Sequence, residues 1–335
     1  MKKINFTVVT EPPIVDFIYE KVSADFAKKH QLKEWQLIES LKDLHFFKTE
    51  LAKQNTSFMK KSGGQLTNTL YNLNILSKRK ETPISSAILS VMATDNLGLE
   101  YKQELEKVDV NTDFVHSFES TTANCLSVSI ATAELSKAML TYWSDFKSLE
   151  NIRLQRFTDL CLQTQYLFFE GYLFNSEPLL IEKFIAIAKK IQETDNPSLK
   201  IGITLSSDFV AKKINKNFVI EYVDIIASND NELLSLMNMT NVEQAIATLN
   251  AKKNKTIVCT LGKKGAFICI NDKSEYIASQ LIDKKKIKDV TGAGDTFLAG
   301  FLYGLLNNKN ILEMGHIAQE VATEIIQTKG ARLVL

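Results

Sequence analysis

From Tyr166 onward the chain alternates short apolar runs with helical segments, and this alternation limits the possible folds more than any other feature of the sequence. Four of the runs have the length and composition of buried strands: 166–169, 201–205, 223–227 and 256–261. Strands separated by helices form βαβ units, which predict a mostly parallel sheet with helices packed on it. Because no stretch rich in Pro, Gly or Ser divides the chain, we expect residues 1–335 to form a single α/β domain.

Polar residues follow each of these predicted strands. They are Glu170, the run 206–208, Asn229 with Glu232, and Thr260. Ligands of open α/β sheets bind beyond the carboxyl ends of the strands, so we expect these residues to converge on one site. Asn229 and Glu232 are three residues apart at the start of a helical segment, which places them on the same helix face.

The N-terminal half follows a different pattern. It mixes two β-rich stretches with a charged helical pattern: 4–9, 14–19 and about 24–53. Further on, 122–131 and 137–143 read as alternating strands around a polar break, which predicts an antiparallel hairpin. We expect residues of about 14–35 and 121–143 to form a small β-rich lid.

A glycine turn at 291–295, with the sequence Thr-Gly-Ala-Gly-Asp, opens an apolar helix. The first N–H groups of a helix lack internal partners and lie at the positive end of its dipole, so they attract anions. A carboxylate next to a bound phosphate is repelled by it, and Asp295 therefore has no place in simple phosphate storage. Its position is explained if it accepts a proton from an attacking hydroxyl. The turn predicts a site of phosphate transfer.

Several other classes of protein are disfavoured. Phe297 stands where the dinucleotide fingerprint G-x-G-x-x-G requires its third glycine, and residues 4–30 lack a glycine-rich turn, which argues against an NAD-dependent oxidoreductase. The chain has no P-loop motif either. Forty basic and thirty-nine acidic residues leave a net charge of +1 with no basic stripe, so we expect no nucleic-acid partner.

The apolar runs are too short for a membrane span, which needs about 18 residues or more, so we expect no membrane partner. The cysteines form no C-x-x-C pair, which fits a reducing compartment. They are Cys125, Cys161, Cys259 and Cys269. We therefore expect a cytoplasmic protein.

Four motifs in order resemble the ribokinase-like (PfkB) carbohydrate kinase family, and within it the adenosine-kinase-like branch. They are G-G-x-x-x-N at 63–68, N-x-x-E at 229–232, T-x-G-x-x-G at 260–265 and D-x-x-G-A-G-D at 289–295. The resemblance covers nearly the whole chain. It implies a three-layer α/β/α fold with a mostly parallel central sheet and a small β-rich lid. It also implies transfer of the γ-phosphate of ATP, with Mg²⁺, to the hydroxymethyl group of a nucleoside or small sugar.

The resemblance implies roles for individual residues. Asp295 would be the general base, and the N–H groups of Gly292, Ala293 and Gly294 would stabilise the transferring group. The residues that would line or hold the nucleotide are Asn229, Glu232, Thr260, Gly262 and Gly265. Among these, Glu232 would act on Mg²⁺ through water. Those that would face the acceptor are Asp16, Gly63, Gly64 and Asn68. Glu170, at a strand end, is a further candidate contact for acceptor hydroxyls.

The acceptor half departs from the family pattern. Glu11-Pro12-Pro13 replaces a common Gly-Asn-Pro, the segment 90–98 loses two glycines, Thr122-Ala123 replaces Thr-Gly, and Lys137 stands where arginine is typical. A lysine has no planar fork for bidentate contacts, so the acceptor is in doubt more than the chemistry.

These departures leave alternatives open. Adenosine is the first acceptor to test, but a ribokinase or fructokinase-type sugar kinase fits as well. A sensor that binds nucleotide or sugar without turnover is a third reading. Some relatives also hold a monovalent cation such as K⁺ near the loop before Asp289, and the sequence leaves this open. The chain is expected to be a monomer or a homodimer through the lid hairpin, because an exposed strand edge is a natural dimer surface.

Overall fold

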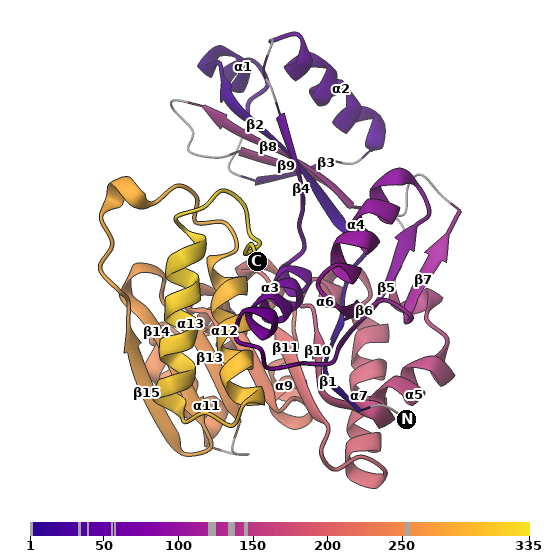
Figure 1. The fold of residues 1–335 in the computed structure, drawn as a ribbon, viewed down its shortest axis with the longest axis vertical. Coiled ribbons are helices and arrows are strands. Elements are labelled where there is room, and N and C mark those ends of the chain that lie inside the picture. The colour runs from indigo at the N-terminus through magenta and orange to yellow at the C-terminus, as the bar shows by residue number, and fades with distance from the viewer. Residues whose placement is uncertain are drawn as a thin grey trace.

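The computed structural model describes residues 3–32, 35–38, 40–54, 56, 58–119, 125–132, 138–143, 147–251 and 255–335. In these residues two β-sheets organise the fold (Figure 1). The larger sheet contains β1 (Ile4–Val9), β5 (Ser86–Ala93), β6 (Val110–Asn111), β7 (Val115–Phe118), β10 (Thr164–Phe169), β11 (Lys200–Thr204), β12 (Ile225–Asn229), β13 (Thr256–Thr260), β14 (Gly265–Ile270) and β15 (Lys273–Ala278). Its strand order is β15-β14-β13-β12-β11-β10-β1-β5-β6, and β7 pairs with β5.

The larger sheet is parallel from the pair β12–β13 through to its β5 edge. Among the strands that the structure describes there, only β14 and β15 add antiparallel pairs. Alternate residues of its strands belong to two separate cores, as the period of two requires. In β12, Ile225 and Ala227 belong to one core and Ile226 to the other. The predicted α/β class and mostly parallel sheet are confirmed.

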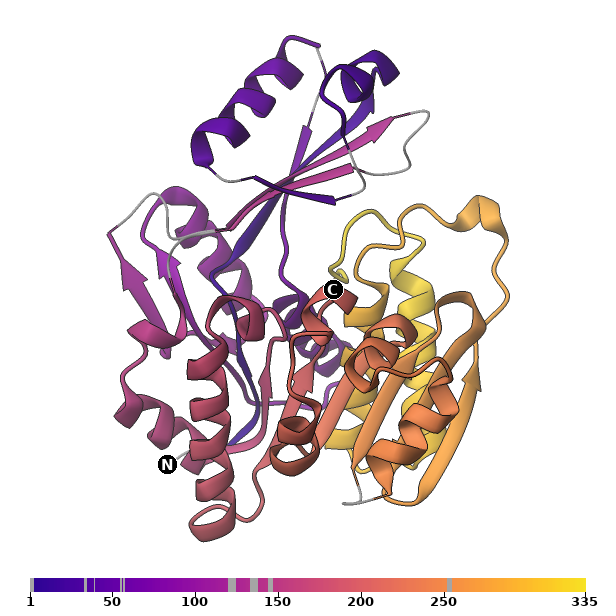
Figure 2. The same ribbon diagram turned by 180° about the vertical axis from the view of Figure 1, so that it is seen from behind.

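Helices cover both faces of this sheet, which gives the three-layer arrangement (Figures 1 and 2). One face packs against α3 (Gln65–Arg79), α12 (Ala293–Leu306) and α13 (Ile311–Ile325). The other packs against α5 (Leu154–Gln163), α7 (Pro178–Thr194), α10 (Asp230–Met237) and α11 (Val242–Asn250). Among the described residues, none of the helices has both the length and the apolarity needed to span a membrane. The four cysteines are buried free thiols.

The smaller sheet stands at one end of the molecule, with its two helices on the side away from the larger sheet (Figure 1). It contains β2 (Ile14–Val22), β3 (Trp35–Ile38), β4 (Phe58–Ser62), β8 (Cys125–Thr132) and β9 (Ala138–Tyr142), in the order β3-β9-β8-β2-β4. The helices are α1 (Ala24–Lys29) and α2 (Leu41–Ala52). β8 and β9 pair antiparallel, as predicted for the hairpin. Residues 121–124 and 133–137 of that region, including Thr122, Ala123 and Lys137, lie outside the described residues.

One prediction for this region was wrong. The charged helical pattern over 24–53 is interrupted by β3, which pairs with β9. The helix resumes because Ser40 caps α2 by accepting a hydrogen bond from the Asp43 N–H at 3.2 Å. The small sheet therefore includes β3, α2 and β4 in addition to the two segments expected to form the lid. Its movement as a lid stays a prediction.

Candidate functional site

Two adjoining cavities lie where the strands of the larger sheet end. The larger, about 410 Å³, lies between the two sheets, and the smaller, about 80 Å³, lies over the ends of β12 and β13. Asp295 and Gln65 line both cavities, and no other described residue does. The predicted convergence of the strand ends is therefore partly realised: Ser206 lines the larger cavity, while Asn229, Glu232 and Thr260 line the smaller.

The glycine turn begins α12 in the conformation that the motif requires. Gly292 is the N-cap, with φ +77°, and a Cβ there would lie 2.4 Å from the Cβ of Ala331. A side chain is thus excluded both by backbone conformation and by space. A Cβ on Gly294 would meet no atom of the described residues within 4 Å, so that side of the turn is open. Among the described residues no side chain caps the turn, which leaves the N–H groups of Gly292 and Gly294 available to an anion. The N–H of Ala293, which was also predicted to face the anion, donates instead to the carbonyl of Val290 at 3.2 Å.

Asp295 lies in the first turn of α12, where the two cavities meet. Its Oδ2 accepts a hydrogen bond from Asn68 Nδ2 at 3.0 Å, and its carbonyl accepts one from Thr69 Oγ1 at 3.1 Å. The pKa of Asp295 is raised to about 7, chiefly by burial. The carboxyls of Glu170 and Glu232 add to the rise, and the Asn68 hydrogen bond opposes it. A carboxyl with a pKa near neutrality suits a general base.

Asn229 and Glu232 form a capping box at the start of α10. Asn229 Oδ1 accepts from the Glu232 N–H at 2.9 Å, and Glu232 Oε2 accepts from the Asn229 N–H at 3.0 Å. Burial raises the pKa of Glu232 to about 7. The pair therefore stabilises the helix start as well as lining the small cavity.

The two glycines after β13 do not line either cavity. Gly262 has φ +56°, and a Cβ there would meet none of the described part of the chain within 4 Å. Gly265 has φ +119°, and a Cβ there would lie 2.0 Å from the carbonyl oxygen of Ile277. Gly265 thus shapes the turn, and Gly262 leaves room beside it.

The carboxyl of Glu232 fits the usual way in which proteins bind Mg²⁺. Within the described part of the chain, no three His, Cys, Asp or Glu residues lie close enough to hold a metal by themselves. Mg²⁺ commonly binds through one or two carboxylates, waters and substrate phosphates. Glu232, a single buried carboxyl beside the open turn, fits this pattern.

Asp289 precedes the turn and is tied into the protein. Its Oδ1 accepts from Thr291 N at 2.9 Å and from Thr291 Oγ1 at 2.6 Å, and its Oδ2 accepts from Gly330 N at 3.2 Å. These bonds hold the loop that would carry a monovalent cation. Binding of K⁺ there stays a prediction.

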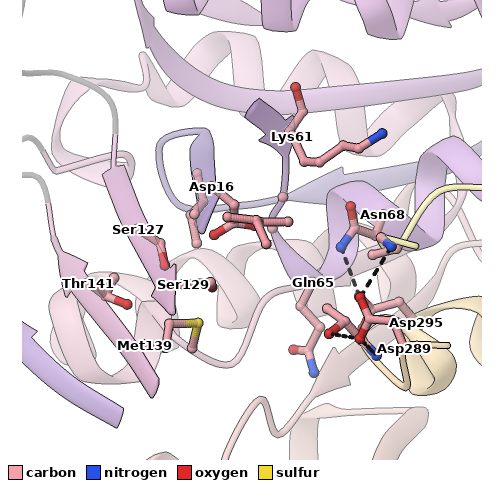
Figure 3. A pocket seen from close by; sticks show the side chains of 18 of the residues that line it. Asp16, Lys61, Gln65, Asn68, Ser127, Ser129, Met139, Thr141, Asp289 and Asp295 are labelled. Carbon is pink, nitrogen blue, oxygen red and sulfur yellow. Dashed lines mark hydrogen bonds between the residues drawn. The ribbon is translucent and has the colours of Figure 1, made fainter. Parts of the chain in front are cut away.

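The predicted acceptor residues other than Glu170 line the larger cavity (Figure 3). Asp16 comes from β2, and its Oδ2 approaches Gly63 so closely that a Cβ on Gly63 would lie 2.6 Å from it. Gly64 has φ +96°, which favours glycine. Asn68 follows one turn into α3 and contacts Asp295. The chain thus places a carboxylate, a glycine turn and an amide around one space.

Glu170 occupies a different place. It lines neither cavity and is 2% exposed. Its Oε1 accepts from the N–H groups of Gln65 and Leu66, at 3.1 and 3.4 Å, and its Oε2 accepts from Glu11 N at 3.2 Å. Burial raises its pKa to about 7. Glu170 therefore anchors the start of α3 below the cavity, and the structure gives it no contact with the acceptor space.

Sequence reasoning missed the polar wall of the smaller sheet. Ser127 and Thr141 are cross-strand partners on β8 and β9, and both line the larger cavity. Ser127 Oγ, Thr141 Oγ1 and Trp143 Nε1 are buried and have no hydrogen-bond partner among the described residues. Buried polar groups without partners cost free energy, so a ligand that supplies partners is favoured there. The alternation of hydroxyls along the hairpin was the available signal.

Comparison with known families identifies one match that covers most of the sequence. The sequence profile described as pfkB family carbohydrate kinase matches residues 33–335. Matches to curated proteins are shorter. An adenosine kinase of Dictyostelium discoideum is 28% identical over 181 residues, which cover 50% of this chain and 51% of that protein. A ribokinase of Arabidopsis thaliana is 31% identical over 120 residues, which cover 34% and 31% respectively. The chain thus matches about a third to a half of these relatives' length.

Solved structures match over nearly their whole length. An adenosine kinase from Schistosoma mansoni, in complex with 2-fluoroadenosine, has a TM-score of 0.80 at 17% identity, covering 100% of this chain and 98% of that one. A probable sugar kinase from Rhizobium etli has a TM-score of 0.77 at 22% identity, covering 100% and 96%. At these identities the likeness shows a common fold.

Proposed function

The chain belongs to the pfkB family of carbohydrate kinases, and on this premise we propose that it transfers the γ-phosphate of ATP to a hydroxymethyl group of a nucleoside or small sugar. The observation that carries the proposal is the place of Asp295. This carboxyl lies at the start of α12, faces both cavities and has its pKa raised to about 7. A base between a nucleotide site and an acceptor site is what direct phosphoryl transfer needs.

In the proposed reaction Asp295 and the glycine turn have different roles. The acceptor oxygen attacks the γ-phosphorus, its proton passes to Asp295, and the bond from phosphorus to the β–γ bridging oxygen breaks with its electrons leaving on ADP. The N–H groups of Gly292 and Gly294 stabilise charge on the moving group. Mg²⁺, when bound, neutralises charge on the phosphates. A positioned base contributes about 10²–10⁴ in rate, and one donor of the oxyanion-hole type about 10²–10³.

The larger cavity favours a nucleoside as acceptor. In the view of Figure 3, Asp295 and Asn68 lie on one side, Ser127 and Thr141 on the other, and Asp16 between them. A reacting hydroxyl at Asp295 and a sugar at Asp16 would leave a second polar moiety to meet the unpaired hydroxyls. A nucleobase supplies such a moiety, whereas ribose or fructose alone leaves the wall unpaired.

The proposal is tested by product analysis. Purified protein with ATP and Mg²⁺ is incubated separately with adenosine, other nucleosides, ribose and fructose, and both ADP and phosphorylated acceptor are measured. We expect acceptor-dependent ADP release with one phosphorylated product, highest with a nucleoside. Highest turnover with a free sugar would identify the sugar-kinase alternative. Saturable ATP binding without product from any acceptor would contradict catalysis and favour a sensor.

Loss of a hydroxyl from the polar wall is expected to weaken acceptor binding. Thr141→Val keeps the shape of the side chain but removes its hydrogen bond, so we expect KM for the acceptor to rise about 5–10-fold. The value of kcat should change less than about threefold, since Thr141 lies on the opposite side of the cavity from Asp295 in the view of Figure 3. Steady-state kinetics measure both values, with exposed Thr194→Val as the matched control. An unchanged KM would remove Thr141 from the acceptor site.

A further inference from the structure

Gln65, like Asp295, lies where the two cavities meet. The smaller cavity, about 80 Å³, has room for phosphate groups of a nucleotide but not for the whole molecule. A phosphoryl group that moves from there to an acceptor in the larger cavity must pass the place where the two cavities meet. Among the described residues only Asp295 and Gln65 line both. Asp295 has the role of base in the proposed function, and Gln65 has been given none.

Neighbouring residues fix the position of Gln65. Its backbone N–H donates to Glu170 Oε1 at 3.1 Å, and its carbonyl accepts from Thr69 Oγ1 at 3.2 Å. Its side-chain Oε1 accepts from Ser206 Oγ at 2.6 Å. Both ends of the residue are therefore anchored, and Figure 3 shows its amide on the floor of the larger cavity.

Ser206 adopts a backbone conformation that a non-glycine residue rarely takes. Its φ is +63°, in the left-handed region, and the residue is 9% exposed. Its Oγ also lies 3.3 Å from Thr204 Oγ1. Unfavourable backbone conformations persist where the surrounding structure imposes them, and they gather at functional sites. Here the strained residue is the one that directs the Gln65 amide.

The bond from Ser206 determines which end of the amide faces the cavities. Because Oε1 accepts from the Ser206 hydroxyl, the Nε2 group is left with two N–H donors. In the residues that the structure describes, Nε2 has no hydrogen-bond partner. The acidic groups around the junction, Asp295 and Glu232, cannot donate to an anion once ionised. A neutral amide supplies a donor there without a charge that would pair with the base.

We propose that Gln65 is a further catalytic residue, whose Nε2 donates a hydrogen bond to the phosphoryl group as it passes between the cavities, with Ser206 as its positioning residue. The proposal rests on the proposed phosphotransferase activity. In the transition state the charge of the moving group is spread over three equatorial oxygens, and a donor aimed at one of them lowers the barrier. Gln65 keeps its protons throughout: the acceptor proton goes to Asp295, and the electrons of the broken bond leave on ADP.

Kinetics of three variants test the role. Gln65→Leu removes the donor, and we expect kcat to fall about 10²–10³-fold, with KM for ATP and acceptor within about threefold of the parent. Gln65→Glu removes the donor and adds negative charge, so kcat should fall further. Ser206→Gly removes the hydroxyl while tolerating the left-handed backbone, and should lower kcat about 10-fold through misorientation of the amide. Gln244→Leu, on the exposed face of α11, is the matched control.

Binding of a transition-state mimic separates this proposal from the proposed function. ADP with Mg²⁺ and aluminium fluoride imitates the planar phosphoryl group, and calorimetry in the presence of acceptor measures its affinity. We expect Gln65→Leu to weaken the aluminium fluoride complex at least about 30-fold while ADP alone binds as in the parent. A parent that binds ADP with aluminium fluoride no more tightly than ADP alone would contradict the proposed function, and the role of Gln65 with it. Equal weakening of both ligands, or a variant with unchanged kcat or a change in KM alone, would overturn the proposal.

Discussion

Replacement of Asp295 by asparagine is expected to lower kcat for phosphoryl transfer by about 10²–10⁴. Asparagine keeps the size of the side chain, and its carbonyl oxygen can still accept from Asn68 Nδ2, which now lies 3.0 Å from Asp295 Oδ2. It cannot accept the proton of the acceptor. The loss therefore falls on the chemical step rather than on the shape of the site.

Stability should move in the opposite direction to activity. The pKa of Asp295 is raised from 3.8 to about 7, so between these values the folded protein binds more protons than the unfolded chain. Stability thus falls as pH rises through this range, and asparagine removes that penalty. We expect an unchanged or higher Tm for the Asp295→Asn variant at pH 8. Rapid-quench kinetics and thermal melts measure both effects, with exposed Asp272→Asn as control. Near-normal turnover would contradict the role of base.

Replacement of Glu11 by glutamine is expected to stabilise the protein by about 2–4 kcal/mol at pH 9. Glu11 is 3% exposed, and burial raises its pKa from 4.5 to about 8, with Glu170 and Glu177 adding to the rise. Ser176 Oγ donates to it and opposes the rise. A buried carboxyl of this kind must ionise above pH 8 at a cost that glutamine avoids. Glutamine can keep the hydrogen bond from Ser176.

The stability gained from Glu11→Gln should increase with pH. Between pH 4.5 and about 8 the folded state holds the Glu11 proton and the unfolded state releases it, so stability of the parent falls as pH rises. The gain from Glu11→Gln should therefore be small near pH 5 and reach its full size above pH 8. Urea unfolding at several pH values measures it, with exposed Glu221→Gln as control. A gain that is independent of pH would show that ionisation of Glu11 is not its source.

The parts of the fold that sequence predicted depend on local patterns. The strands β11 (Lys200–Thr204) and β13 (Thr256–Thr260) contain short apolar runs, and the turn at Gly292 needs a left-handed backbone. Such features depend on residues close in sequence. The antiparallel hairpin of the small sheet was predicted for the same reason.

The parts that sequence missed depend on contacts between distant residues. The strand β3 lies in a charged region with a helical pattern, and its pairing with β9 brings together residues about 100 positions apart. Glu170 reads as a polar strand end open to ligand, but the N–H groups of Gln65 and Leu66 occupy its carboxylate. The orientation of the Gln65 amide depends on a hydrogen bond from Ser206, which lies 141 residues away.

The pH dependence of kcat/KM for the acceptor tests the central claim, that Asp295 is the base between the two cavities. This quantity reports the ionisation of the free enzyme. The raised pKa of Asp295 predicts that kcat/KM increases with pH, with a midpoint near 7, and levels off above it. A profile that stays flat between about pH 5.5 and 8.5, with chemistry shown to limit the rate, would contradict the claim.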